Sequence, residues 1–324
     1  MKVYVVGAGA VGLYLGSALE SIGNEVVYAP RALDAVTPVD VDLAIVAVKA
    51  YDTPSAVATL RRALVDPSRT AILCPQNGVG NEEKLIEAFG ADPVVAAALT
   101  APVERGRDGA SRPANRGGLV IAPVGAKSHN WILAAFGSSG MTVQAADDWR
   151  ALKWSKLAIN IVANATCAIL NVLPDRLVHF EGAFALEVRA IRECRAVMRA
   201  LRVNCIDLPG YPVRALQAIA SLPSPVARLV LGRRIARGRG SKPPSLLLDL
   251  RAAKNVTEVS VLNGAIATIG RTHGVPTPVN ATLARVVEDV SAMPALWAKY
   301  RERPSVLEAE VAAERARTAR AVHV

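Results

Sequence analysis

The stretch that decides the fold lies at the start of the chain and reads Lys2-Val-Tyr-Val-Val6, Gly7-Ala-Gly9-Ala-Val-Gly12, Leu13-Tyr-Leu-Gly-Ser-Ala-Leu19. A short apolar run, a glycine turn and a helical pattern follow one another, which is the order found in dinucleotide-binding βαβ units. Gly7 would allow the tight turn, Gly9 would let the backbone approach a pyrophosphate, and Gly12 would pack the helix on the strand. The N–H groups that open the helix, including those of Ala10 and Val11, would then bind the phosphates. A purely structural turn is the alternative.

The second predicted strand bears on the choice of cofactor. Glu25-Val-Val-Tyr28 is followed by Ala29-Pro30-Arg31. An NAD-binding protein usually has an aspartate or glutamate here to hold the ribose hydroxyl, and this chain has an arginine instead. Because a guanidinium can bind a 2′-phosphate, Arg31 points to NADP(H). An ordinary surface arginine is the alternative.

Further buried strands are predicted in the first half of the chain, and they cover residues 41–48, 70–74, 93–97, 118–122 and 141–144. Lys49 and Asn77 come just after the first two of these. Ligands of open parallel sheets bind beyond the carboxyl ends of the strands. With a helix at 55–65, the pattern predicts a Rossmann-type domain over residues 1–147.

From residue 148 the pattern becomes helical, so the expected fold class is α/β, with an N-terminal Rossmann-type doubly wound sheet and an all-α C-terminal domain over 148–300. Helices are expected at 148–170, opened by an Asp147-Asp148 cap, at 180–203, and from 245 to 292 with a break at 274–280. The arginine-rich segment 233–242 predicts a loop that either orders over an anionic ligand or is a solvated surface. The stretch 301–324 is expected to be a charged tail, a solvated helix or frayed end.

One helix of the second half has a polar stripe on an apolar segment, Trp154-Ser-Lys156-Leu-Ala-Ile-Asn160-Ile-Val-Ala-Asn164. Lys156, Asn160 and Asn164 recur every fourth residue, so a continuous helix would place them on one face. Since the other faces are apolar, the stripe would line a cleft. The alternative is a lysine at the edge of a core, with two asparagines that bond nearby backbone.

Composition narrows the class of protein. The chain has 324 residues, 52% of them hydrophobic, which fits two packed domains. It shows neither a signal peptide nor an apolar run long enough to span a membrane, so a cytoplasmic protein is expected. The four cysteines and four histidines are scattered, so no metal site is expected. The formal charge is +10, but only 4% of residues are aromatic, which favours an anionic cofactor and a carboxylate substrate over nucleic acid.

Taken in order, the motifs resemble those of the ketopantoate reductase family, NADPH-dependent enzymes of coenzyme A biosynthesis that reduce 2-dehydropantoate to pantoate. They are Gly7-Ala-Gly9-Ala-Val-Gly12, Val46-Ala-Val-Lys49-Ala, Gln76-Asn77-Gly78, Trp154-Ser-Lys156-Leu-Ala-Ile-Asn160, Ser245 to Asp249, Thr257-Glu258, Leu262-Asn263-Gly264 and Gly274-Val-Pro-Thr-Pro-Val-Asn280.

The resemblance implies a role for each matched residue. Lys156 corresponds to the family's catalytic lysine and Glu258 to its conserved acid. A cation that also donates a proton suits the negative charge that hydride transfer leaves on a ketone oxygen. The remaining implied roles are cofactor contacts at Lys49 and Asn77, and substrate contacts at Asn77, Asn160, Asn164 and Ser245. A homodimer is one oligomeric state that the sequence allows.

The sequence departs from the family pattern in two places. Arg31 is followed by a shorter segment than is usual before the next strand, and Ser245 is followed by Leu-Leu-Leu where the family often has a glutamine before the aspartate. A paralogous reductase of another 2-keto acid is therefore an alternative. Two others are a non-catalytic NADPH-binding sensor and a nucleic-acid-binding protein that uses the 233–242 arginines.

Overall fold

The computed structural model describes residues 1–106, 108–113, 117–238 and 242–321. Apart from the gaps between these ranges, they form two compact units, the first made of Met1–Lys156 and Ile206–Pro212 and the second of Leu157–Cys205 and the described residues from Val213 onward. The division falls within helix α5 (Trp149–Asn160), later than the boundary expected at residue 147. The reason is that the first turns of α5 pack on the sheet, where the Lys153 side chain is bonded to main-chain oxygens of Gln76 and Ala97.

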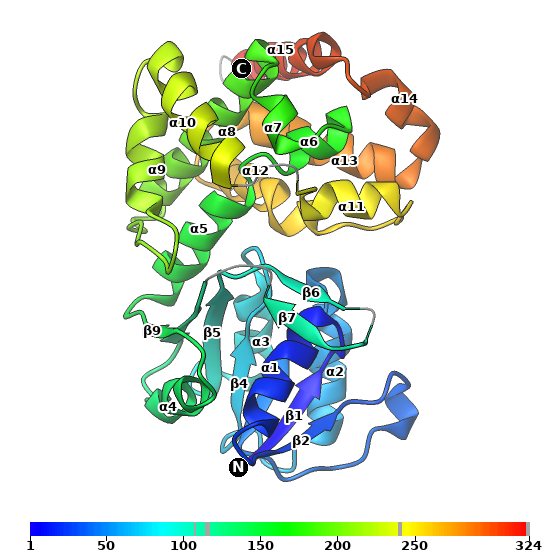
Figure 1. Cartoon of the computed structure of the whole chain (residues 1–324), viewed down its shortest axis with the longest axis vertical. Coiled ribbons are helices and arrows are strands. Elements are labelled where there is room, and N and C mark those ends of the chain that lie inside the picture. Colours follow the sequence, from blue (N-terminus) through cyan, green and yellow to red (C-terminus); the bar gives the residue numbers. More distant parts are fainter. Residues whose placement is uncertain (107, 114–116, 239–241, 322–324) are drawn as a thin grey trace. The chain divides into compact units, whose positions relative to one another are not determined.

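The first unit contains a seven-stranded sheet in the order β2-β1-β3-β4-β5-β8-β9 (Figure 1). All neighbouring strands are parallel except the antiparallel pair β5 and β8. The strands are β1 (Lys2–Val6), β2 (Glu25–Tyr28), β3 (Leu43–Val46), β4 (Ala71–Cys74), β5 (Val94–Leu99), β8 (Leu119–Pro123) and β9 (Val143–Ala145). The order reverses direction at β1 and β3, as expected for a Rossmann-type sheet.

Alternating side chains of the strands pack into two separate hydrophobic cores, one on each face of the sheet. Val3 and Val5 pack with helix α1 (Ala10–Glu20) on one face of the sheet. Tyr4 and Val6 pack on the opposite face, in the core that also contains residues of α2 (Thr53–Ala63) and α3 (Asn81–Phe89). Because successive side chains of a strand point to opposite faces, these continuous apolar strands are buried on both sides. The doubly wound prediction is confirmed.

Two features of this unit were not predicted. A short hairpin, β6 (Val103–Arg105) with β7 (Ser111–Pro113), packs against α1. The other is the direction of β8, since a strand at 118–122 was predicted but its antiparallel pairing with β5 was not. Helix α4 (Asn130–Ser138) then leads to β9, which pairs with β8 in parallel.

The described part of the second unit is helical, as predicted. Its elements are α6 (Ala165–Leu170), α7 (Pro174–Leu177), α8 (Glu181–Ala200), α9 (Val213–Ala220), α10 (Ser224–Gly238), α11 (Ser245–Arg251), η3 (Glu258–Val261), α12 (Asn263–Thr272), α13 (Pro278–Ala292), η4 (Pro294–Leu296), α14 (Trp297–Tyr300) and α15 (Pro304–Ala321).

The helix predicted at 148–170 is in fact two helices. Helix α5 ends at Asn160 and α6 begins at Ala165. Between them Ala163 has a φ of 49°, and its N–H donates to Glu187 Oε2 at 2.6 Å, with Glu187 buried. A buried acceptor on α8 thus holds the chain in a left-handed conformation that a helix does not contain.

Two other expectations need correction. The helix expected from residue 245 is divided into α11, η3 and α12. In the segment 233–242, predicted as a loop, residues 233–238 are the last turns of α10, and 239–241 lie outside the described residues. The predicted ordering of that loop over a ligand is therefore not tested by the fold.

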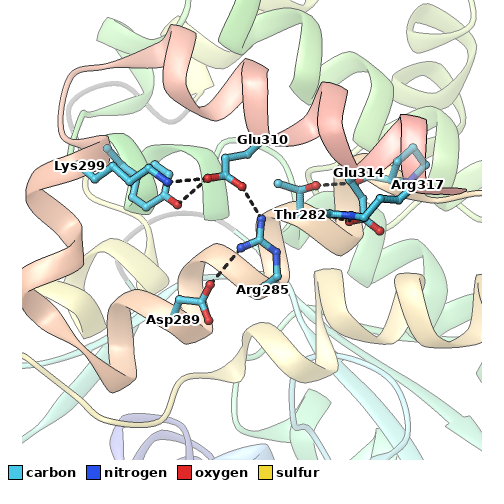
Figure 2. Close-up of polar contacts among 9 residues, drawn as sticks. Thr282, Arg285, Asp289, Lys299, Glu310, Glu314 and Arg317 are labelled. Carbon is cyan, nitrogen blue, oxygen red and sulfur yellow. Dashed lines mark hydrogen bonds and ion pairs between the residues drawn. The ribbon is translucent and has the colours of Figure 1, made fainter.

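In the C-terminal stretch, α15 (Pro304–Ala321) is an integral helix of the second unit. Leu307 and Val311 of α15 are buried to 0% and 1% exposure, and α15 packs on α8 and α13. Figure 2 shows Glu310 between Lys299 and Arg285, at 2.6 and 2.8 Å, with Arg285 also bonded to Asp289 at 3.1 Å. The expectation of a solvated tail was wrong because two apolar residues one turn apart face the core.

Candidate functional site

The glycine turn has the geometry expected of a dinucleotide loop. Gly7 has a φ of +110°, and a Cβ there would lie 2.7 Å from main-chain atoms of Ala47 and Val48. A Cβ on Gly12 would lie 1.9 Å from the carbonyl oxygen of Gly7, so α1 can approach β1 only with glycine at that position. A Cβ on Gly9 would meet nothing within 4 Å. The space in front of Gly9 is therefore open, as the approach of a pyrophosphate requires.

Ala10 and Val11 open helix α1, and Gly9 is its N-cap, with no side chain that caps the helix. The N–H groups of a first helical turn have no partner within the helix, so those of Ala10, Val11 and Gly12 are donors directed toward the helix N-terminus. Together with the helix dipole they favour an anion. The open face of Gly9 and this first turn fit the diphosphate of a dinucleotide.

Arg31 lies just beyond the carboxyl end of β2, in an exposed position. Among the described residues its side chain makes no hydrogen bond or ion pair, and the residues directly after the strand, Ala29 and Pro30, are not acidic. The guanidinium is accordingly accessible to an added phosphate, which is the feature expected of an NADP(H) site.

Lys49 and Asn77 follow neighbouring strands of the sheet. Lys49 is the residue before η2 (Ala50–Asp52), after β3, and Asn77 is exposed after β4. The main-chain oxygen of Asn77 accepts from Asn81 Nδ2 at 3.0 Å. Since β3 and β4 are adjacent and parallel, both residues lie at the carboxyl edge where ligands of such sheets bind.

Beneath this edge lies a buried group of polar side chains. Gln76 Nε2 donates to the Val48 oxygen at 2.9 Å and is 3.0 Å from Thr53 Oγ1, which in turn is 3.2 Å from Asn81 Oδ1. Gln76, Thr53 and Asn81 are all buried. The loops that follow β3 and β4 are thus bonded to each other through side chains.

A buried ion pair, absent from the sequence predictions, extends the group. Lys153 Nζ lies 2.8 Å from Glu82 Oε1, with exposures of 1% and 0%. The same ammonium donates to the Gln76 oxygen at 2.5 Å and to the Ala97 oxygen at 3.2 Å. Burial, the largest single effect, lowers the pKa of Lys153, but the charge and hydrogen bond of Glu82 together with the nearby Cys74 and Glu83 outweigh it, and the pKa lies above its ordinary value. The only sequence signal was a second lysine one turn before Lys156.

Lys156 lies one turn after Lys153 on α5. Asp148 caps this helix, as predicted, because its side chain accepts hydrogen bonds from the N–H groups of Arg150 and Ala151 at 2.8 and 3.1 Å. Its side chain is half-buried, and its Nζ is 6.0 Å from the centre of the Tyr211 ring. Lys156 therefore remains within reach of a ligand, whereas Lys153 does not.

Three predicted substrate residues come together in the second unit. Asn164 Nδ2 donates to the Asn160 oxygen at 3.1 Å and lies 3.4 Å from Ser245 Oγ, while Asn164 Oδ1 accepts from the Leu246 N–H at 3.1 Å. Asn164 caps the start of α11 in this way. It lies beyond the end of α5, so Lys156, Asn160 and Asn164 do not share one helix face as the spacing predicted.

Glu258 begins η3, is 6% exposed, and follows Thr257, whose Oγ1 accepts from the Val259 N–H at 3.4 Å. Glu258 belongs to the second unit, and Lys156 belongs to the first.

A groove of about 800 Å³ in the second unit is lined by residues of α12, α13 and α15, among them Arg271, Arg285 and Arg317. None of the predicted site residues lines it. Among the described residues no three His, Cys, Asp or Glu side chains are placed to hold a metal. A membrane-crossing helix is likewise not found in the part of the chain that the structure describes.

Comparisons with known proteins agree with the fold. The model of the family described as ketopantoate reductase PanE/ApbA matches residues 22–125, and that of its C-terminal domain matches 148–291. The chain is 31% identical over 250 residues to a 2-dehydropantoate 2-reductase of Caulobacter vibrioides, covering 76% of this chain and 77% of that protein. It is also 31% identical over 260 residues to the enzyme of the same name from Halobacterium salinarum, covering 79% and 78%.

A solved structure of a PanE/ApbA family ketopantoate reductase from Ralstonia eutropha superposes with a TM-score of 0.73 at 30% identity. The match covers 90% of this chain and 99% of that one.

Proposed function

This chain belongs to the ketopantoate reductase family, and from that premise we propose that it reduces 2-dehydropantoate to pantoate with NADPH, a step of pantothenate and coenzyme A biosynthesis. It is an oxidoreductase of the ketopantoate reductase type. The choice of NADPH rests on Arg31 after β2. The choice of substrate rests on the names of its relatives together with the intact Lys156 and Glu258.

The residues that would hold the cofactor are those of the glycine turn and the sheet edge. Gly7, Gly9 and Gly12 leave room for the diphosphate, with the N–H groups of Ala10 and Val11 as donors. Arg31 would bind the 2′-phosphate, and Lys49 and Asn77 would meet the cofactor near the reacting centre. When bound, the nicotinamide supplies the hydride.

Lys156 is proposed as the general acid. Its ammonium would lie beside the keto oxygen, stabilise the negative charge that develops there, and donate a proton to form the hydroxyl, leaving a neutral amine. Glu258 would hold a hydroxyl of the substrate. Asn160 and Ser245 would bind the substrate, and Asn164, which bonds to both, would orient them.

The observation that carries the proposal is the contrast between the two lysines of α5. Lys153 is buried and bonded to Glu82, whereas Lys156 is half-exposed one turn later. A lysine that only anchored the helix would resemble Lys153. The position of Lys156 supports a role toward a ligand.

A second candidate is reduction of a different 2-keto acid. It is favoured by Leu246, Leu247 and Leu248 after Ser245, where the family often has a glutamine. Leu246 and Leu247 are buried, while Leu248 is 51% exposed on α11. Three leucines in place of a glutamine would suit a keto acid with a less polar side chain than 2-dehydropantoate.

The deciding experiment is turnover of NADPH, followed by its absorbance, against 2-dehydropantoate and a panel of other 2-keto acids. The proposal expects 2-dehydropantoate to give the highest kcat/KM. A higher kcat/KM for another acid would establish the second candidate. If NADPH binds but no acid is reduced, the chain is a cofactor-binding sensor.

A further inference from the structure

The buried group around Lys153 lies within the first unit and outside the residues given a role so far. The Lys153 ammonium contacts three acceptors, namely Glu82 and the main-chain oxygens of Gln76 and Ala97. These acceptors belong to α3, to the loop after β4, and to β5. One ammonium thus joins α5 to three separate parts of the nucleotide-binding unit.

A series of hydrogen bonds connects this ammonium to the surroundings of both predicted cofactor residues, Asn77 and Lys49. Gln76 directly precedes Asn77, and the Gln76 side chain donates to the oxygen of Val48, the residue before Lys49. Thr53 and Asn81 then connect back to the Asn77 oxygen. Asn77 is therefore held from both sides, and Lys49 is held through its neighbour.

The energetics favour a positioning role over a stabilising one. Two charges that are fully buried lose their hydration, and replacing such a pair by apolar side chains is often neutral or stabilising. Cys74, beside the pair, is completely buried, and its pKa is raised first by burial and then by the Glu82 carboxylate. An apolar pair in place of Lys153 and Glu82 would, however, leave the main-chain oxygen of Gln76 without the hydrogen-bond donor that Lys153 provides.

We propose that Lys153, paired with Glu82, is a positioning residue that holds Asn77 and Lys49 in the geometry needed to bind the nicotinamide end of the cofactor. The inference rests on the proposed function, because it takes the cofactor to be NADPH. It assigns no contact between Lys153 and any ligand. Its effect passes through the Gln76 main chain and through the Thr53 hydroxyl.

The test compares two ligands in the Lys153→Met/Glu82→Met variant. NADPH has the nicotinamide end, whereas 2′,5′-ADP has only the adenosine end that Arg31 would bind. We expect the variant to bind NADPH about 10–100-fold more weakly than the wild type, since a hydrogen bond to a charged group such as Lys49 has about this effect on affinity. Its Kd for 2′,5′-ADP should stay within about twofold, because the glycine turn and Arg31 are untouched. Kd values come from nicotinamide fluorescence and calorimetry.

Two further variants make the result decisive. Arg285→Met breaks the ion pairs to Asp289 and Glu310 in the second unit, so it controls for a general loss of stability and should leave both Kd values unchanged. Thr53→Val keeps the side-chain shape and removes the hydroxyl between Gln76 and Asn81, so it should weaken NADPH binding about 3–10-fold even if the double variant fails to fold.

Three outcomes would be distinguishable. NADPH affinity equal to wild type in the double variant, or in Thr53→Val, would overturn the positioning role. Equal losses for NADPH and 2′,5′-ADP would also overturn it, because they would indicate general damage. If the wild type itself binds no NADPH, the proposed function fails, and that result does not depend on any variant.

Discussion

Lys156 and Lys153 lie one turn apart on α5 and have different surroundings, which leads to a first prediction. Lys156→Ala should fold and bind NADPH normally, because the side chain is half-exposed. Its kcat should fall about 10²–10⁴-fold, which corresponds to about 3–5 kcal/mol of barrier for a lost proton donor. Steady-state kinetics with the preferred keto acid, together with the Tm of the variant, would measure both effects.

Asn160→Ala provides the contrast for that prediction. A residue that binds substrate equally in the ground and transition states changes KM more than kcat. We expect Asn160→Ala to raise KM with a smaller effect on kcat. A Lys156→Ala variant with kcat within a few-fold of wild type and a lowered Tm would mean that Lys156 only packs at the edge of the core.

Arg31 leads to the second prediction. Arg31→Ala should weaken NADPH binding by about 1.5–3 kcal/mol, the range for a hydrogen bond to a charged group, and should leave NADH binding unchanged. The exposed Arg61 of α2 offers a matched control, since Arg61→Ala removes the same charge from the unit. Fluorescence titrations with both cofactors measure the effect. Equal Kd values for NADPH and NADH in the wild type would contradict the assignment.

At the scale of the elements, the packing of α1 on β1 predicts different effects for substitutions at Gly12 and Gly9. Gly12→Ala places a Cβ against the Gly7 carbonyl, so α1 must move, and we expect a loss of about 1–3 kcal/mol of unfolding free energy. Gly9→Ala meets nothing, so its Tm should match the wild type while NADPH binding weakens. Thermal unfolding and titration of both variants test this. Unchanged NADPH affinity in Gly9→Ala would show that no diphosphate approaches there.

The N-terminus of α13 gives a prediction on pH. Glu193 accepts from the N–H groups of Val279 and Asn280 at 3.0 and 2.9 Å. Burial raises the pKa of Glu193 above its ordinary value of 4.5, although these N–H donors oppose the shift. Since the folded state holds the proton more tightly, this contribution to stability is fully present below pH 4.5 and is lost as pH rises through the raised pKa.

Glu193→Gln removes that titration. The difference in unfolding free energy between wild type and variant should therefore shift in favour of the variant as pH increases from about 4 to 7. Urea unfolding at several pH values measures the difference. A difference that does not change with pH would show that the pKa of Glu193 is the same in the folded and unfolded states.

The elements that sequence reasoning predicted are those with a strong local signal. The glycine turn, the buried strands and α8 each follow from a short pattern of residue types. The direction of β8 does not, because a strand buried on both faces has the same apolar composition in either orientation. The three-residue strands β6 and β7 are too short and too exposed for an alternating pattern to be recognised.

The site was predictable to the same extent. The places of Lys49, Asn77 and the glycine turn follow from strand ends, whereas Asn160, Asn164 and Ser245 were named from the family resemblance and their roles stay predictions. The break at Ala163 was missed because it depends on a carboxylate of α8, which is distant in sequence. The Lys153–Glu82 pair was missed for the same reason, since only the folded chain brings α5 and α3 together.

At the scale of the whole molecule, α15 shows how the second unit is completed. The ion pairs in Figure 2 involve side chains that are partly exposed, so each contributes at most about 1 kcal/mol. Burial of Leu307 and Val311 should therefore dominate. We expect Leu307→Ala to lower the unfolding free energy by about 2–5 kcal/mol, more than Lys299→Ala does. Urea unfolding of both variants, with the exposed Ala313→Ser as control, measures the difference. A larger loss in Lys299→Ala would mean that the charges, rather than the apolar side chains, attach this helix.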